Sequence, residues 1–312
     1  MTRVVLAQAI RYCDVGLGLV FTEEIMETTT RGWWNGFFGV LIFAGSLPAT
    51  RVAVLDLDPV FLTMARASIA GCLGWLMLLL MRQPRPGRDM LPALLLVALG
   101  VVLGFPLLTA LAMQHMTSAE GLVYLGLLPL CTAIFGVIRT GDRPRPLFWL
   151  FALLGSGFVA AYALHQVDAV SWKGGTLMLA ACIVCGLGYA EGARLTRVLG
   201  GWQVISWALV LSLPVMLPLA WWWTPTSFVS VSTPAWIGLA YVSLFSMLIG
   251  FVFWYRGLAL GGVAAVGQLQ LIQPFFGLAL AAALLNESVS WTMLIVTLAT
   301  VVCVAGAKRF AG

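Results

Sequence analysis

Long apolar segments alternate with short polar breaks along most of this chain. A helix needs about 20 mainly apolar residues to cross the hydrocarbon core of a bilayer. Proline-rich and arginine-rich stretches such as RQPRPGRD (82–89) and RTGDRPRP (139–146) separate the apolar segments. The pattern predicts an all-α integral membrane protein with ten transmembrane helices, at 33–52, 59–81, 90–112, 119–138, 147–164, 173–193, 202–223, 235–256, 262–285 and 290–308.

The composition agrees with this class. Of 312 residues, 61% are hydrophobic and 9% are charged, against roughly 45–50% and 25% in soluble domains. A water-soluble fold cannot cover so much apolar surface, because large exposed patches drive association. We therefore expect the lipid bilayer as a partner. The net charge of +5 has a common cause in basic cytoplasmic loops, so no nucleic-acid partner is expected.

The lysines and arginines are distributed unevenly between the predicted loops. With the N-terminus inside, 14 of the 17 fall in inner segments; Arg51 and Lys173 lie outside, and Arg66 lies within a span. This bias predicts that both termini are cytoplasmic. Residues 1–32, whose apolar part is interrupted by charged residues, are expected to form a cytoplasmic N-terminal leader.

The second half of the chain repeats the first at an offset of 145 residues. The alignment places Pro129 against Pro274 and continues without a gap for about fifty residues. Five spans precede the second copy, and because five is odd the copies cross the membrane in opposite directions. Such inverted repeats are typical of secondary transporters. The sequence therefore predicts two inverted five-helix repeats, at 33–165 and 172–308.

Six segments carry a more specific pattern: GSLPATRVAV (45–54), DPVFLTMARASIA (58–70), TSAEGLVYLGLLPL (117–130), RTGDRPRPLFW (139–149), ALGGVAAVGQLQLIQP (259–274) and LLNESVSW (284–291). Across residues 33–308 the chain resembles the EamA-type transporters of the drug/metabolite transporter superfamily. In that family a glutamate usually follows the fourth and ninth helices. Glu287 matches this pattern, and Asp142 replaces the other glutamate.

The resemblance implies a carrier that exports small metabolites, such as amino acids, across a bacterial inner (plasma) membrane by alternating access. Efflux of drugs or toxic compounds is the alternative within the same class. A non-transporting membrane receptor or scaffold is the alternative from another class. It predicts no flux of solute in liposomes.

Two charged residues lie inside predicted spans and are candidates for binding the substrate. A charge within a bilayer is costly, so it normally faces the protein interior or a wet cavity. Arg66 in the second span would attract a carboxylate or phosphate, and Glu120 in the fourth would take an amine or a proton. The alternative is structural: the two side chains pair with each other, or Glu120 extends to the outer surface.

The ninth span carries amides where the fourth carries charge. Gln270 and Gln273 are three residues apart and share one helix face, so they are candidates for substrate binding or for an interhelical hydrogen bond. Pro129 and Pro274 each free a backbone carbonyl inside a span. They are therefore predicted as hinges.

Three aromatic residues complete the predicted substrate site. Tyr124 lies four residues after Glu120, so both can face one cavity, and Trp254 and Tyr255 lie late in the eighth span.

No enzyme is expected. GSG (155–157) and His165 lie too far apart along a helix for a nucleophile–base pair, and no motif for a metal, a cofactor or ATP is present. Coupling would therefore use protons, with Glu120 as candidate carrier, or the gradient of the substrate itself.

Overall fold

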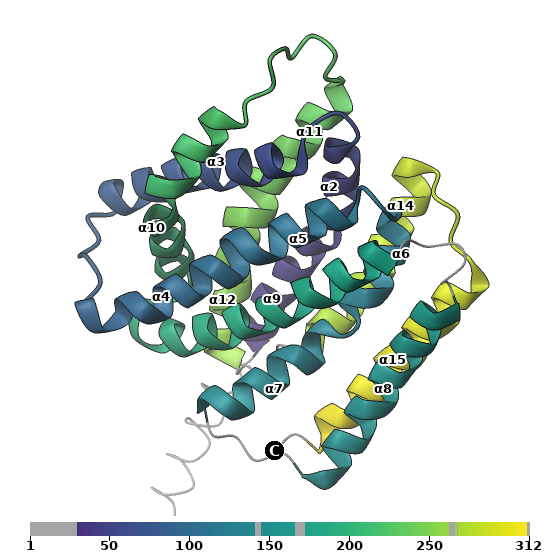
Figure 1. Ribbon diagram of the computed structural model, residues 1–312. Helices are drawn as coiled ribbons and strands as arrows, with labels where there is room; N and C mark the ends of the chain where they lie inside the picture. Colours follow the sequence, from purple (N-terminus) through teal and green to yellow (C-terminus); the bar gives the residue numbers. More distant parts are fainter. Residues whose placement is uncertain (1–29, 141–144, 166–171, 262–265, 267, 311–312) are drawn as a thin grey trace, which may run out of the picture.

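The computed structural model describes residues 30–140, 145–165, 172–261, 266 and 268–310. Within these ranges the chain forms helices joined by turns, and no described residue lies in a strand (Figure 1). The predicted leader (1–32) lies outside the described residues except at its last three positions, and so does the start of the predicted span 262–285.

The first half begins with a helix over 30–44. It continues with α2 (Ser46–Val54), α3 (Pro59–Leu80), η1 (Arg88–Met90), α4 (Leu91–Val97), η2 (Ala98–Gly104), α5 (Phe105–Ala112), α6 (Ser118–Leu125), α7 (Leu128–Thr140) and α8 (Pro146–His165). The second half contains α9 (Trp172–Leu199), α10 (Gly201–Trp222), α11 (Thr233–Tyr241), η3 (Val242–Ile249), α12 (Gly250–Gly261), η4 (Gln268–Ile272), α14 (Gln273–Leu285) and α15 (Trp291–Arg309).

Seven helical segments among the described residues are long and apolar enough to cross a membrane, and each coincides with a predicted span. Three shorter apolar helices occupy the places of the other predicted spans: Pro146–Phe158, Gln273–Leu285 and Trp291–Ala307. The structure thus confirms the all-helical membrane class.

Local sequence signals fix where α3 begins. The Asp58 carboxylate accepts hydrogen bonds from the backbone N–H of Val60 (2.8 Å) and Phe61 (3.0 Å). Pro59 occupies the first turn, where a helix loses nothing by lacking an N–H. This cap sets the register of α3 and therefore the depth of Arg66, seven residues after Pro59.

The two halves exchange their first helices. In the first half α2 packs against α11 and α14 of the second, whereas α9 of the second half packs against α4, α5 and α7 of the first. Helices α3 and α10 pack side by side, and α8 and α15 form a pair at one edge of the molecule (Figure 1). The helices of the two halves therefore form one interleaved bundle.

Matching irregularities interrupt both halves. The third and eighth spans each contain a π-helical segment, η2 (Ala98–Gly104) and η3 (Val242–Ile249), and shifting η2 by 145 residues places it on η3. Pro106 follows η2 and removes the N–H that would bond the carbonyl of Val102 in an α-helix. Such π segments are frequent at functional sites.

The predicted hinge prolines lie at matching breaks as well. Helix α6 ends at Leu125, and Pro129 is the second residue of α7. Pro274 is the second residue of α14, directly after the 3₁₀ segment η4. Both prolines therefore follow a change of helix, although their function as hinges remains a prediction.

Two polar contacts mark the two ends of the bundle. At the first, the Asp56 end, Ser232 donates its backbone N–H and its hydroxyl to the Asp56 carboxylate. These bonds hold the pKa of the Asp56 carboxyl below its ordinary value, so the contact persists above that value and is lost as the pH falls through the lowered pKa. At the second, the Arg139 end, Arg139 pairs with Glu191 at 2.8 Å.

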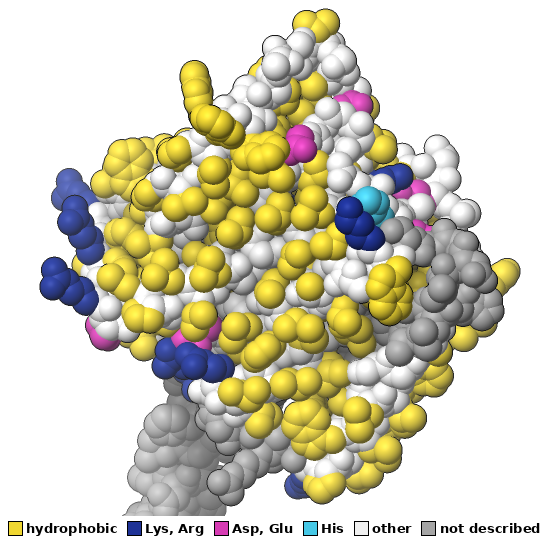
Figure 2. Space-filling model, in the orientation of Figure 1, with side chains coloured by type: hydrophobic (Ala, Val, Ile, Leu, Met, Phe, Trp, Pro, Cys, Tyr) yellow, Lys and Arg dark blue, Asp and Glu magenta, His cyan; other side chains and the backbone are white. Residues whose placement is uncertain are grey.

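The charges of the described residues are divided between these ends. Figure 2 shows Lys and Arg side chains at the left and lower margins of a largely hydrophobic face, and a separate group beside the His side chain at its upper right. The loops and helix termini at the Asp56 end carry Arg51 and Lys173. Those at the Arg139 end carry Arg82, Arg85, Arg88, Arg139, Arg145, Arg194, Arg197, Arg256 and Arg309.

Close approach of η2 and α9 requires glycine, which gives a test of this packing. A Cβ on Gly100 would lie 2.6 Å from the carbonyl oxygen of Val184 and 3.1 Å from the Cα of Gly188. We expect Gly100→Ala to destabilise the purified protein by about 1–3 kcal/mol, the usual cost of overpacking, and to lower its melting temperature in detergent.

Gly157 on α8 is the matched control, because a Cβ there would meet no atom within 4 Å. Gly157→Ala should leave the melting temperature unchanged or raise it slightly. Equal melting temperatures for the two variants would contradict the packing of η2 on α9.

Candidate functional site

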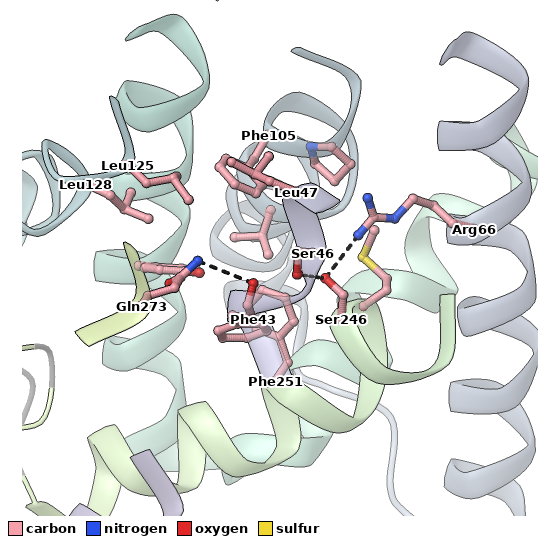
Figure 3. A pocket seen from close by; sticks show the side chains of 14 residues that line it. Phe43, Ser46, Leu47, Arg66, Phe105, Leu125, Leu128, Ser246, Phe251 and Gln273 are labelled. Carbon is pink, nitrogen blue, oxygen red and sulfur yellow. Dashed lines mark hydrogen bonds between the residues drawn. The ribbon is translucent and has the colours of Figure 1, made fainter. Parts of the chain in front are cut away.

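A mostly apolar cavity with a few polar side chains lies where both halves meet (Figure 3). The volume of the cavity is about 20 Å³, which is room for about one water molecule. The cavity is lined by Phe43, Ser46, Leu47, Arg66, Val101, Phe105, Pro106, Leu125, Leu128, Tyr189, Ser246, Met247, Phe251 and Gln273.

Arg66 is the only charged side chain among these lining residues. Its side chain extends from α3 toward the middle of the cavity (Figure 3), and the residue is only 4% exposed. Nη2 donates to Ser246 Oγ at 3.3 Å, whereas the buried Nε has no partner. Within the described part of the chain no carboxylate forms an ion pair with Arg66. The predicted pairing of Arg66 with Glu120 is therefore absent.

Three further polar groups face Arg66 or lie across the cavity from it. The hydroxyls of Ser46 and Ser246 are 2.7 Å apart and share a hydrogen bond. Gln273 donates its Nε2 to the backbone carbonyl of Phe43 at 3.4 Å. Figure 3 shows these side chains converging from α2, η3 and α14. Their weak or shared bonds leave donors and acceptors that a solute can use.

Aromatic rings form much of the remaining wall. Phe43 and Phe251 lie 4.9 Å apart between ring centroids, and Tyr189 lies 6.0 Å from Phe251. Phe105 contributes a partly exposed ring from the start of α5. A mostly apolar wall with a few convergent polar groups is the usual construction of a small-molecule site.

Residues related by the 145-residue offset line the cavity in pairs. Ser246 corresponds to Val101, Phe251 to Pro106 and Gln273 to Leu128, and all six are lining residues. In two of the three pairs the second half supplies a polar side chain where the first supplies an apolar one. The cavity is therefore built from equivalent positions that carry different chemistry.

Of the predicted site residues, Arg66 and Gln273 line the cavity and the other five do not. Trp254 lies one layer behind, with its ring 6.3 Å from Phe43 and 5.9 Å from Tyr189. Gln270 is 4% exposed, and neither atom of its amide has a partner among the described residues.

The two predicted tyrosines face helix α9. A Cβ on Gly175 would lie 2.6 Å from the hydroxyl of Tyr124, and one on Gly192 would lie 2.3 Å from that of Tyr255. Both hydroxyls therefore occupy the space that these glycines leave open, away from the cavity. Their role in substrate binding remains a prediction without support from this geometry.

Glu120 belongs to a capping box at the start of α6. The Thr117 side chain accepts from the Glu120 N–H at 3.2 Å, and the Glu120 carboxylate accepts from the Thr117 N–H at 2.8 Å. This motif satisfies backbone donors that a helix start leaves free. It gives the half-buried carboxylate a structural role, and the carriage of a proton or an amine by Glu120 remains a prediction.

A second glutamate also binds the start of α6. Glu287 follows α14 and accepts from the N–H groups of Ser118 (3.1 Å) and Ala119 (2.9 Å) and from the Ser118 hydroxyl (2.7 Å). It thereby ties the ninth span to the fourth at the Asp56 end. Asp142, its counterpart by the offset, lies outside the described residues.

A fully buried glutamate makes the corresponding tie at the Arg139 end. Glu191 on α9 accepts from Arg139 Nε at 2.8 Å and from Arg194 Nε at 3.0 Å. Arg139 lies near the end of α7, so the fourth span is held at both of its ends. Each tie depends on one carboxylate.

Sequence reasoning missed Ser46, Ser246 and the aromatic lining residues. The repeat gave no signal for Ser246, because the offset that aligns Pro129 with Pro274 pairs this serine with the apolar Val101. A sequence signal did exist for the structural role of Glu120, because the spacing Thr-x-x-Glu at 117–120 is a capping-box signature before an apolar segment. No group of His, Cys, Asp or Glu suited to a metal ion occurs among the described residues.

Comparison with known proteins agrees with this architecture. The model of the EamA-like transporter family matches residues 30–163 and 172–307. The uncharacterized transporter YdeK of Bacillus subtilis (strain 168) is 63% identical over 286 residues, which cover 92% of this chain and all of that protein. One solved crystal structure has the same fold, with a TM-score of 0.66 at 19% identity over 90% of this chain and 98% of that one.

The family match covers most of the chain in two consecutive parts, and the relative aligns over its whole length. Together with the apolar helices, these matches identify a multi-pass membrane transporter, not an enzyme. The chain therefore belongs to the EamA-like transporter family.

Proposed function

We propose that this protein is a secondary transporter of ten spans, built from two inverted five-helix repeats at 33–165 and 172–308. It exports small metabolites, such as amino acids, across the plasma (inner) membrane of a bacterium by alternating access. The observation that carries this proposal is the cavity lined by three offset-related pairs with a buried Arg66 among them.

The repeat is supported by packing as well as by sequence. Exchange of the first helices, α2 and α9, is the arrangement expected of two halves related by a two-fold axis. The π segments η2 and η3 and the breaks before Pro129 and Pro274 recur at the same offset. An odd number of spans before the second copy makes the copies antiparallel.

The orientation follows from the division of charge between the two ends. Because cytoplasmic loops carry an excess of Lys and Arg, the arginine-rich Arg139 end is proposed as the cytoplasmic one. This orientation places the Asp56 end outside and both termini in the cytoplasm.

Alternating access would open the two ends in turn. The Glu287 tie closes the fourth span against the ninth outside, and the Glu191 tie closes it against α9 inside. Release of one tie with retention of the other would rock the halves about the breaks at Pro129 and Pro274. The narrow free space in the cavity requires such an opening for any substrate larger than water.

Coupling has two candidates, protons and the gradient of the substrate itself. The capping box gives the Glu120 carboxylate a structural role that does not involve proton transport. Glu120 also does not line the cavity. This geometry favours the substrate gradient.

Replacing Arg66 tests the proposed site. Loss of a buried charge that pairs with a ligand costs about 2–5 kcal/mol of binding, so Arg66→Gln should reduce export to background. Untargeted mass spectrometry of spent medium would compare cells that express equal amounts of wild type, Arg66→Gln and Arg88→Gln. Arg88 is the matched control, because it is an exposed arginine of the 82–89 loop.

We expect one or more metabolites to accumulate outside cells with wild type and Arg88→Gln only. Equal accumulation with Arg66→Gln would refute the role of Arg66. A drug efflux carrier would make the cells resistant to a drug, and no metabolite would accumulate outside them. A receptor or scaffold would give no resistance, no accumulated metabolite and no flux of solute in liposomes.

Glu120→Gln tests proton coupling. Glutamine also completes a capping box, so this variant should keep its melting temperature and the pH dependence of its transport. Glu120→Ala, the matched control, should lose about 0.5–2 kcal/mol of stability with the cap. Loss of the pH dependence in Glu120→Gln at normal expression would instead make Glu120 a proton carrier.

A further inference from the structure

The Arg66 guanidinium lacks a countercharge in a place where charge is costly. It has five N–H donors, yet the hydrogen bond found for it among the described residues is one long contact with Ser246. Its Nε is buried without a partner. A buried cation is normally paired with an anion. Because the described residues offer Arg66 no carboxylate, a bound anion is the natural partner.

The number of charges in the cavity limits the charge of that anion. Arg66 is the only ionised group among the lining residues. A phosphate ester with two charges would therefore bury one of them without a partner, and Gln273 and the serines could only hydrogen-bond to it. One carboxylate matches one guanidinium in charge and in its fork-like geometry.

The same count argues against an ammonium group on the substrate. In an amino acid the ammonium is attached beside the carboxylate, so it would lie close to Arg66 and repel it. No lining residue is an acid that could offset this repulsion, and Glu120 is engaged in its capping box. A neutral oxygen at that position would instead accept a hydrogen bond from Ser46, Ser246 or Gln273.

The rest of the wall indicates an apolar body. Phe43, Phe251 and Tyr189 line the cavity with their rings in contact, and the Trp254 ring packs against them. Apolar area removed from water stabilises binding in proportion to that area. A branched or aromatic group of a few carbons fits this wall once the halves have opened.

We infer that the substrate is a small organic monocarboxylate with an apolar body and no ammonium group, bound by Arg66 and Ser246 through its carboxylate. This inference rests on the proposed function and narrows its substrate class from small metabolites to monocarboxylates such as 2-oxo acids, which excludes amino acids. It also gives a direction. A monoanion that leaves the cell moves down the inside-negative membrane potential, so export needs no coupled proton.

Binding to the purified protein in detergent tests the inference independently of transport. Four probes share one branched apolar body and differ in charge: 4-methyl-2-oxopentanoate, leucine, isoamylamine and isoamyl phosphate. Their dissociation constants are measured from the shift in melting temperature and from tryptophan fluorescence. We expect 4-methyl-2-oxopentanoate to bind at least about tenfold more tightly than each of the others, because only its charge is fully paired.

Variants link this selectivity to the cavity. Arg66→Gln should weaken binding of 4-methyl-2-oxopentanoate at least about 30-fold, as expected for loss of a buried charge partner. Ser246→Ala, which removes one hydroxyl, should weaken it about two- to tenfold. Arg88→Gln is the matched control and should bind as the wild type does. Ser246→Ala keeps the test decisive if Arg66→Gln does not fold.

Equal or tighter binding of leucine, isoamylamine or isoamyl phosphate would overturn the inference, and so would the absence of any shift with all four probes. Failure of transport would be separate from these outcomes, because binding is measured without flux. Arg66-dependent binding without flux in liposomes would retain the site and reject the transporter. Equal fluxes of leucine and 4-methyl-2-oxopentanoate in liposomes would retain the transporter and reject the inferred substrate class.

Discussion

A positive charge inside an apolar helical bundle is the constraint on which this structure depends. Arg66 is nearly inaccessible, and one long hydrogen bond to Ser246 is a weak compensation for the water that its guanidinium gives up. The surrounding elements keep that charge in place: the Asp58 cap fixes the register of α3, and η3 brings Ser246 within reach. A bundle that served packing alone would be more stable with an apolar residue here, so the charge points to a ligand.

The two halves supply a shared frame and unequal chemistry. Equivalent positions line the cavity, yet Ser246 and Gln273 are polar where Val101 and Leu128 are apolar. Under the proposed function, the shared frame lets the halves rock about matching breaks, and the unequal side chains give the substrate one defined orientation. The ties made by Glu287 and Glu191 lie at opposite ends of the fourth span. Under the same proposal, each tie closes one end of the bundle.

The sequence predicted the class of fold far better than the site. Apolar length and the loop charges predict spans directly, because the bilayer imposes one requirement on every segment. Arg66 was accessible to the same reasoning, since a charge within a span is rare. Ser46 and Ser246 were not, because a serine in an apolar helix usually bonds its own backbone and its direction depends on packing. Tyr124 and Tyr255 were predicted from their positions, four residues after Glu120 and late in the eighth span, but their hydroxyls occupy the space that glycines on α9 leave open.

Access to the cavity from each side of the membrane tests the central claim most directly. Ser46 lines the cavity, and cysteine differs from serine by one atom. Ser46→Cys, in a variant without its native cysteines, would be treated with a membrane-impermeant thiol reagent in intact cells and in inverted vesicles. The account predicts labelling from both sides and protection by 4-methyl-2-oxopentanoate. Labelling from neither side, or from one side only, would contradict alternating access to this cavity.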